Sequence, residues 1–276
     1  MKSIASLLPA LLLIGGCGQD NAPLVESATT EPVSESVADP VEASAPTPSV
    51  YEAAVADDSR SEADRARDVN RKPAEVLAFF GIEPGMDVLD MFSGGGYYTE
   101  IVSRVVGPDG SVYAHNNSAY TQFVGEEASA RYADDRLPNV EFLMAENNEL
   151  GLSPGSFDAI LMVLAYHDIY YVAPNDNWPK IDGPKLIAEF YAGLRPGGIL
   201  GIVDHYAAAG SPRETGNTLH RIDPEIVISE LERAGFVLED KSNILRNMDD
   251  DHSLSMSADE VRGRTDRFVL RFRKPN

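Results

Sequence analysis

The chain has 276 residues, of which 23 are Lys or Arg and 44 are Asp or Glu, so its formal net charge is −21. Binding to a nucleic acid depends largely on neutralising phosphates with basic side chains, and this charge balance therefore disfavours such a partner. The hydrophobic content of 43% is typical of a globular protein. A single cysteine excludes an internal disulfide framework and a cluster of thiolate metal ligands.

The amino terminus has the pattern of an export signal. Lys2 supplies a positive charge, and residues 4–14 form an apolar stretch that is followed by two glycines and Cys17. This stretch is too short for a transmembrane helix, which needs about 20 residues. The four residues that end at Cys17 (IGGC) resemble the lipobox of bacterial lipoproteins, which implies a signal over residues 1–16 and a lipidated cysteine. Gly18 resembles the next residue of lipoproteins that are anchored in the outer membrane and face the periplasm.

An ordinary secretory signal with an incidental cysteine is the alternative. The following stretch, residues 19–59, contains no Lys or Arg and is rich in Ala, Ser, Thr, Pro and Glu. Such a segment has too little clustered apolar surface to offset the entropy lost on ordering. We therefore expect a disordered acidic tether over residues 17–60 and a folded domain over residues 61–276.

The pattern of apolar residues in the folded part predicts helices that alternate with strands. A helix is expected over residues 63–80, and a turn then leads to a buried strand over residues 86–91. Further strands are predicted at residues 111–116, 140–144, 157–164 and 199–204, with helices at residues 97–106 and before residue 194. This alternation predicts an α/β protein with a doubly wound sheet, which binds ligands at the carboxyl ends of its strands.

A glycine-rich loop connects the strand at residues 86–91 to the helix at residues 97–106. It contains Ser93 followed by the three glycines Gly94, Gly95 and Gly96. Glycine lets the backbone approach a ligand closely, and the start of a helix offers free amide groups. Glycine also serves simply to turn the chain, so the loop by itself fits either role.

Three segments together resemble the class I S-adenosylmethionine-dependent methyltransferases. They are residues 88–90 (VLD) with the glycines after them, residues 157–160 (FDAI) and residues 194–198 (LRPGG). The resemblance extends from about residue 73 to the carboxyl terminus. It implies a seven-stranded Rossmann-like sheet whose last strand, residues 267–272, runs antiparallel, and it implies S-adenosylmethionine as the cofactor.

The resemblance also implies which residues hold the cofactor. They are Asp90, Ser93, Gly94, Gly96, Asn116, Glu146 and Asn147. Asp90 and the glycines would line the methionine part, Asn116 would meet the ribose and Glu146 the adenine. Two residues depart from the family pattern. Phe92 replaces the first glycine of the usual Gly-x-Gly-x-Gly loop, and Asn116 replaces an acid, which makes its hydrogen bond to a ribose hydroxyl weaker.

Polar residues follow the fourth and fifth predicted strands, where this family builds its acceptor site. His167 and Asp168 follow the fourth strand, Asp204 and His205 lie at the end of the fifth and just after it, and His220 precedes the next helix. Histidine can take or give a proton near neutral pH, so we expect His167, Asp168 and His205 to be the catalytic residues. These side chains could instead cap helices and solvate loops. Asp168, Asp204 and His205 could alternatively bind a divalent metal ion, and metal dependence stays open at this point.

The loop at residues 170–184 is rich in Pro, Asn, Asp and aromatic residues and contains Trp178. Such loops commonly form lids or substrate walls, and a small, partly aromatic or apolar acceptor suits this one.

Taken together, these features lead us to expect a lipid-anchored enzyme that methylates oxygen or nitrogen of a small molecule. A non-catalytic binding module on the same fold is the main alternative, and a hydrolase or isomerase that uses the His and Asp cluster is another. The acceptor and the oligomeric state are not identified by the sequence.

Overall fold

The computed structural model describes residues 47–173 and 177–276. The predicted signal, Cys17 and most of the predicted tether lie outside the described residues. The end of that tether is folded: helix α1 (Val50–Val55) begins with a capping box between Ser49 and Glu52, and its Ala54 is buried. The prediction that the folded domain begins at residue 61 is therefore wrong, because the apolar face of α1 packs into the core.

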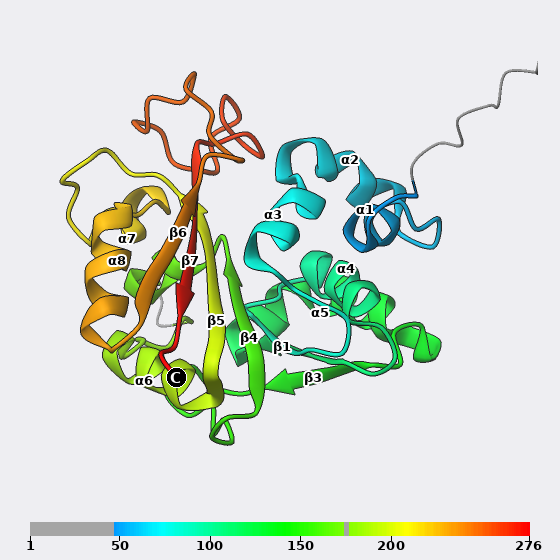
Figure 1. Cartoon of the computed structure of the whole chain (residues 1–276). Helices are drawn as coiled ribbons and strands as arrows, with labels where there is room; N and C mark the ends of the chain where they lie inside the picture. The colour runs from blue at the N-terminus through cyan, green and yellow to red at the C-terminus, as the bar shows by residue number, and fades with distance from the viewer. Residues whose placement is uncertain (1–46, 174–176) are drawn as a thin grey trace, which may run out of the picture. The chain divides into compact units, whose positions relative to one another are not determined.

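A seven-stranded sheet in the order β3-β2-β1-β4-β5-β7-β6 forms the centre of the described body (Figure 1). The strands are β1 (Asp87–Met91), β2 (Ser111–Asn116), β3 (Val140–Met144), β4 (Phe157–Val163), β5 (Leu194–His205), β6 (Val237–Ser242) and β7 (Arg267–Arg273). Strands β1 to β5 pair in parallel, and β7 is antiparallel to β5 and β6. This confirms the predicted doubly wound α/β sheet with an antiparallel last strand.

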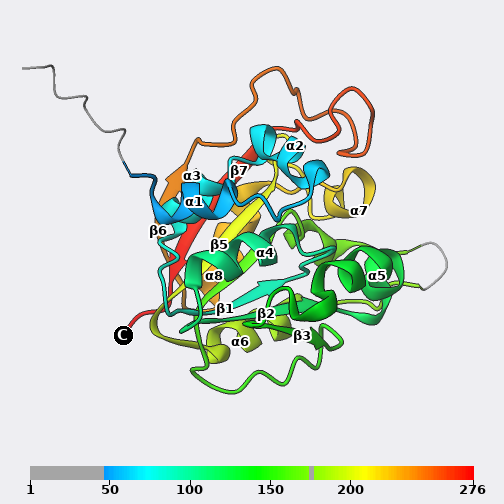
Figure 2. The ribbon, with the colours of Figure 1, turned by 90° about the vertical axis from the view of Figure 1, so that its right-hand side faces the viewer.

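Helices cover both faces of the sheet (Figure 2). The α-helices after α1 are α2 (Glu62–Arg71), α3 (Pro73–Phe80), α4 (Tyr97–Val106), α5 (Ser118–Tyr132), α6 (Gly183–Gly193), α7 (Thr215–Leu219) and α8 (Pro224–Arg233). Two short 3-10 helices are η1 (Ala133–Asp135) and η2 (Tyr166–Tyr170). Helices α1, α3 and α4 pack against one face, and α6 and α8 pack against the other, so each face has its own apolar core. No helix among the described residues is long and apolar enough to cross a membrane.

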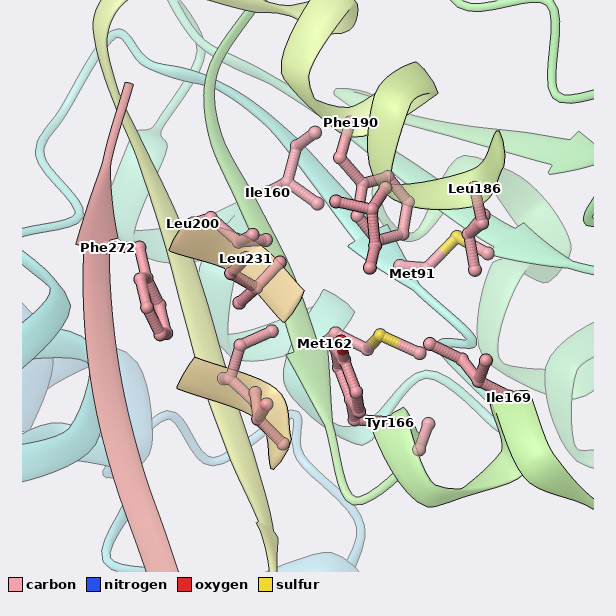
Figure 3. Close-up of a cluster of buried hydrophobic side chains, with 14 of the residues drawn as sticks. Met91, Ile160, Met162, Tyr166, Ile169, Leu186, Phe190, Leu200, Leu231 and Phe272 are labelled. Carbon is pink, nitrogen blue, oxygen red and sulfur yellow. The ribbon is translucent and has the colours of Figure 1, made fainter. Parts of the chain in front are cut away.

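Figure 3 shows the core beneath α6 and α8. Met91 of β1, Met162 of β4 and Leu200 of β5 meet Phe190 of α6 and Leu231 of α8 there, and all five side chains are fully buried. Parallel strands carry apolar residues on both faces because helices cover both, which explains the continuous apolar runs in these strands. This packing holds the carboxyl ends of β1, β4 and β5 at one edge of the sheet.

The helix predicted at residues 63–80 is two helices. Lys72 adopts a left-handed conformation with φ of 42°, and Pro73 then begins α3. Proline disfavours a helical residue before it and lacks an amide hydrogen to continue the helix. The break turns α2 toward the glycine loop, where its side chains contact α4 and α5.

Candidate functional site

The glycine loop after β1 is held by Asn116, the last residue of β2. The side-chain oxygen of Asn116 accepts a hydrogen bond from the amide of Gly94 at 3.0 Å, and its nitrogen donates to the carbonyl of Gly94 at 2.9 Å. Gly94 and Gly96 have φ of 58° and 83°, a region that favours glycine. Asn116 is fully buried, so its amide fixes the shape of the loop as well as standing where we predict a ribose contact.

A cavity of about 280 Å³ lies over this loop. It is lined by Asp90, Ser93 and Gly94 together with the guanidinium groups of Arg71 and Arg267. Burial raises the pKa of Asp90 to about 6, and Thr99 donates a hydrogen bond of 2.6 Å to its carboxylate. Burial, reinforced by the neighbouring Arg71, lowers the pKa of Arg267 to about 10. An acid beside two arginines in one cavity suits a ligand that carries both an ammonium and a carboxylate group.

Several buried polar atoms around the loop have no hydrogen-bond partner among the described residues. They include Oγ of Ser93, Oε2 of Glu146, and both amide atoms of Asn147. A buried polar group without a partner costs about 1–3 kcal/mol. These residues follow β1 and β3, and their unpartnered polar atoms fit a ligand with hydroxyl and amine groups such as S-adenosylmethionine. The contacts of its methionine part with Asp90 and of its adenosine with Glu146 and Asn147 stay predictions.

Side chains of α5 pack directly against Gly95 and Gly96 of the loop. A Cβ atom on Gly95 would overlap the carboxylate of Glu127, and one on Gly96 would overlap the hydroxyl of Tyr132. Arg131 donates to the carbonyl of Gly95 and forms ion pairs with other buried acids of α2 and α4. Gly96 therefore makes room for α5, which is a second role for a residue that we predict to bind cofactor.

His167 lies in a second cavity, of about 530 Å³, which is also lined by Asp168, His220 and Trp178. Its Nδ1 is 2.8 Å from Oδ1 of Asp204, and its backbone amide donates to Oδ2 of the same carboxylate at 2.8 Å. Burial favours the neutral form of His167, but the carboxylates of Asp204 and Asp168 outweigh it and raise its pKa to about 9. Asp204 therefore orients the ring and leaves Nε2 facing Asp168 at 3.4 Å.

His205 lies in the cavity over the glycine loop and not beside Asp168. Its Nδ1 is 2.6 Å from the hydroxyl of Thr265, and burial together with the charge of His167 holds its pKa well below the usual value. Both oxygens of Asp204 are engaged by His167 and by the amide of His205. The alternative metal site of Asp168, Asp204 and His205 is therefore not assembled among the described residues.

The two cavities are adjacent. Tyr120, Leu164 and Met256 line both of them. Trp178 stacks on Phe92 with ring centroids 5.7 Å apart, so the loop after η2 reaches the glycine loop, as a substrate wall would. Residues 174–176 of that loop lie outside the described residues.

Sequence reasoning did not identify Tyr120, Arg71 or Arg267 as site residues. Arg267 precedes the apolar run of residues 268–270 in β7, which is a signal for a buried charge, but α2 and α5 give no such signal. The roles predicted for His167, Asp168 and His205, and for the cofactor residues, stay predictions.

Comparisons with known proteins agree with this geometry. A family described as "Methyltransferase domain" matches residues 89–202. The arsenite methyltransferase of Halobacterium salinarum is 28% identical over 170 residues, which cover 62% of this chain and 38% of that protein. The ubiquinone/menaquinone biosynthesis C-methyltransferase UbiE of Hahella chejuensis is 29% identical over 126 residues, which cover 45% of each protein. The chain thus spans less than half the length of these curated relatives.

Solved structures share the fold. The S-adenosylmethionine-dependent methyltransferase from Aquifex aeolicus has a TM-score of 0.54 and 24% identity, covering 76% of this chain and 93% of that one. The arsenic(III) S-adenosylmethionine methyltransferase from Chlamydomonas reinhardtii has a TM-score of 0.51 and 21% identity, covering 84% and 75%. With the sheet order, these neighbours show that the described residues have the fold of S-adenosylmethionine-dependent methyltransferases, and residues 89–202 match a methyltransferase domain.

Proposed function

We propose that the protein transfers the methyl group of S-adenosylmethionine to an oxygen or nitrogen of a small molecule. The observation that carries the proposal is the pair of adjacent cavities, one over the glycine loop and one beside His167. The first suits the cofactor and the second suits an acceptor, and Tyr120 and Leu164 lie at their common wall. Methyl transfer requires the acceptor atom to be held in line with the methyl group, which two facing cavities provide.

The charges beside the second cavity bear on the reaction. With a pKa of about 9, His167 is protonated at neutral pH when no ligand is bound. An imidazolium stabilises an acceptor that has already lost its proton, and it acts as a base only after release of its own. The cavity walls include Trp178, Tyr171 and Phe123, which suit an acceptor with a planar or apolar frame.

The named relatives act on arsenite and on quinones. Arsenic(III) is a soft centre that prefers thiolates, and the only cysteine of this chain is Cys17, in the predicted anchor. A small organic acceptor therefore fits the described site better than arsenite does.

Titration calorimetry with S-adenosylhomocysteine tests the cofactor site directly. We expect one site per chain, and an Asp90→Ala variant should bind at least tenfold more weakly because it loses the contact to the amine. Transfer of a labelled methyl group to phenolic and amine acceptors then tests the activity. Absence of S-adenosylhomocysteine binding to the folded protein would contradict the proposal.

A non-catalytic binding module is the second candidate. It is favoured by the side chains of α5 that occupy the space over Gly95 and Gly96. Under this alternative the protein binds small ligands beside His167, and S-adenosylhomocysteine leaves that affinity unchanged. Calorimetry with and without S-adenosylhomocysteine separates the two candidates.

For the location, we propose a lipid anchor at Cys17 in the outer membrane with the domain in the periplasm. The support is the apolar stretch followed by IGGC. In a bacterial host the protein should fractionate with outer membranes, and a Cys17→Ser form should not. Equal amounts of both forms in the membrane fraction would contradict the anchor.

A further inference from the structure

Three potential metal ligands gather in the cavity beside η2. They are His167 and Asp168, which follow β4, and His220, which follows α7. One ligand atom from each residue lies within 4.8 Å of the ligand atoms of the other two. The rings of His167 and His220 are nearly perpendicular, with centroids 5.3 Å apart. From this arrangement we infer a binding site for one divalent transition-metal ion, with Zn²⁺ the best fit, on His167, Asp168 and His220.

The spacing of the ligand atoms supports a tetrahedral ion. Oδ1 of Asp168 lies 3.4 Å from Nε2 of His167 and 3.6 Å from Nδ1 of His220. Ligands of tetrahedral zinc, with bonds of about 2.0–2.1 Å, are about 3.3 Å apart. Two imidazoles and one carboxylate form the ligand set of catalytic zinc sites, which leave the fourth position open.

Further residues hold the ligands in place. Asp204 is fully buried and its carboxylate is 2.8 Å from Nδ1 of His167, so Nδ1 keeps its proton and Nε2 is the nitrogen that can release a proton and ligate an ion in the cavity. Histidines that ligate metals are commonly fixed by such a carboxylate. The hydroxyl of Tyr120 donates to Oδ2 of Asp168 at 3.4 Å, which leaves Oδ1 for the ion.

The backbone at His220 is also unusual. His220 has φ of 51°, and Leu164, which lines the same cavity, has φ of 60°. Residues other than glycine rarely adopt this left-handed conformation, and those that do gather at functional sites. At His220 this conformation ends α7 and directs the ring toward Asp168. The strain at this position therefore has a function in the proposed site, which is to bring the third ligand to the other two.

The open position of the ion faces the cavity where we place the acceptor, and this part of the inference rests on the proposed function. An acceptor with a hydroxyl group would bind through its oxygen and lose its proton to solvent. That oxygen forms the new bond to the methyl carbon while the bond between carbon and sulfur breaks, and the electron pair stays on sulfur as the thioether. The acceptor class is thus a small aromatic or apolar molecule with a hydroxyl group that can ligate a metal ion.

The test is titration of the chelator-treated, full-length protein with Zn²⁺ against a chromophoric competitor, in a Cys17→Ser background that removes the only thiol. We expect one ion per chain. His220→Gly should weaken binding at least 100-fold, and glycine tolerates the left-handed backbone, so this variant keeps the fold. Asp204→Asn should weaken binding about 10–100-fold as the residue that orients His167. His252→Gln, which changes a histidine outside the cavity, is the control and should bind as the parent does.

Co²⁺ provides a second readout. Bound to the same protein it should show the intense visible bands of a four-coordinate ion, and these bands should be lost in His220→Gly and kept in His252→Gln. Absence of bound Zn²⁺ at micromolar concentrations, or equal affinity in His220→Gly, would overturn the site. The outcome is independent of the proposed methyl transfer, because binding of S-adenosylhomocysteine is measured separately on the same metal-free protein.

Discussion

The two cavities are built in different ways. The cavity over the glycine loop is bordered on one side by backbone: the turn between β1 and α4, its link to Asn116, and the glycines that admit α5. Side chains such as Arg71 and Arg267 complete its walls. The cavity beside η2 is shaped by side chains of segments far apart in the chain, such as His167 and His220. Changes in the first region should therefore affect fold and binding together, whereas changes in the second should remove activity and leave the fold intact.

The largest expected effect is the loss of turnover when a residue of the cavity beside η2 is changed. His167→Gln should lower the rate of methyl transfer by about 10²–10⁴-fold, because the acceptor cavity loses either the group that balances the charge of the acceptor or a ligand of the proposed metal ion. S-adenosylhomocysteine affinity should change less than threefold, since His167 does not line the cofactor cavity. Steady-state kinetics and calorimetry measure the two quantities, with His252→Gln as the control. A variant that turns over at the parent's rate would show that the acceptor site lies elsewhere.

The next effect concerns the stability of the packing between α5 and the glycine loop. Arg131 is buried and pairs with Asp64 and Glu100, so Arg131→Met removes the most buried cation beside these two carboxylates and leaves them only more exposed arginines as partners. The free energy of unfolding should fall by about 3 kcal/mol. Arg273→Met is the matched control, because its pair with Glu239 is partly exposed and contributes about 1 kcal/mol or less. Urea unfolding measures both, and equal losses in the two variants would contradict the role of Arg131.

Asp90, which lies beside the glycine loop, makes the free energy of unfolding depend on pH. Its pKa is about 6 in the folded protein, above its usual value of 3.8, because of burial. Between these values the folded state keeps a proton that the unfolded state has lost, so stability falls as pH rises through this window. Asp90→Asn should therefore raise the free energy of unfolding by about 3 kcal/mol at pH 7 and change it little near pH 3. A gain that is the same at both pH values would refute this origin.

The smallest expected effect separates backbone strain from crowding. Gly81 and Gly96 both have positive φ, of 71° and 83°, but a Cβ on Gly81 meets open space whereas one on Gly96 overlaps Tyr132. Each change to alanine should cost about 1 kcal/mol for the left-handed backbone. Gly96→Ala should cost about 1 kcal/mol more, because Tyr132 must move. Thermal unfolding of the two variants measures the difference. An equal loss of stability in both would show that the side chains of α5 can move away from Gly96 at no cost in free energy.

Local patterns were sufficient to predict the sheet. The apolar strands, the glycine turn and the LRPGG segment each depend on neighbours in sequence. They carry the resemblance to the methyltransferases, and it was this resemblance that implied the antiparallel last strand. The start of the domain was missed because α1 is short and acidic, and it becomes stable only where Ala54 packs into the core. The apolar pattern of residues 63–80 is continuous across Lys72, but Pro73 disfavours a helical conformation at Lys72 and separates α2 from α3.

At the site, the sequence by itself determined the residue types at the ends of the strands, because strand order and direction bring those ends to one edge of the sheet. Tertiary structure decided which of them meet. It directs His205 to the cofactor cavity and His167 to the other, and it brings His220 to Asp168 from more than fifty positions away in the chain. The physical reason is that a strand places its side chains on alternate faces, whereas a loop residue is directed by the packing of whatever surrounds it.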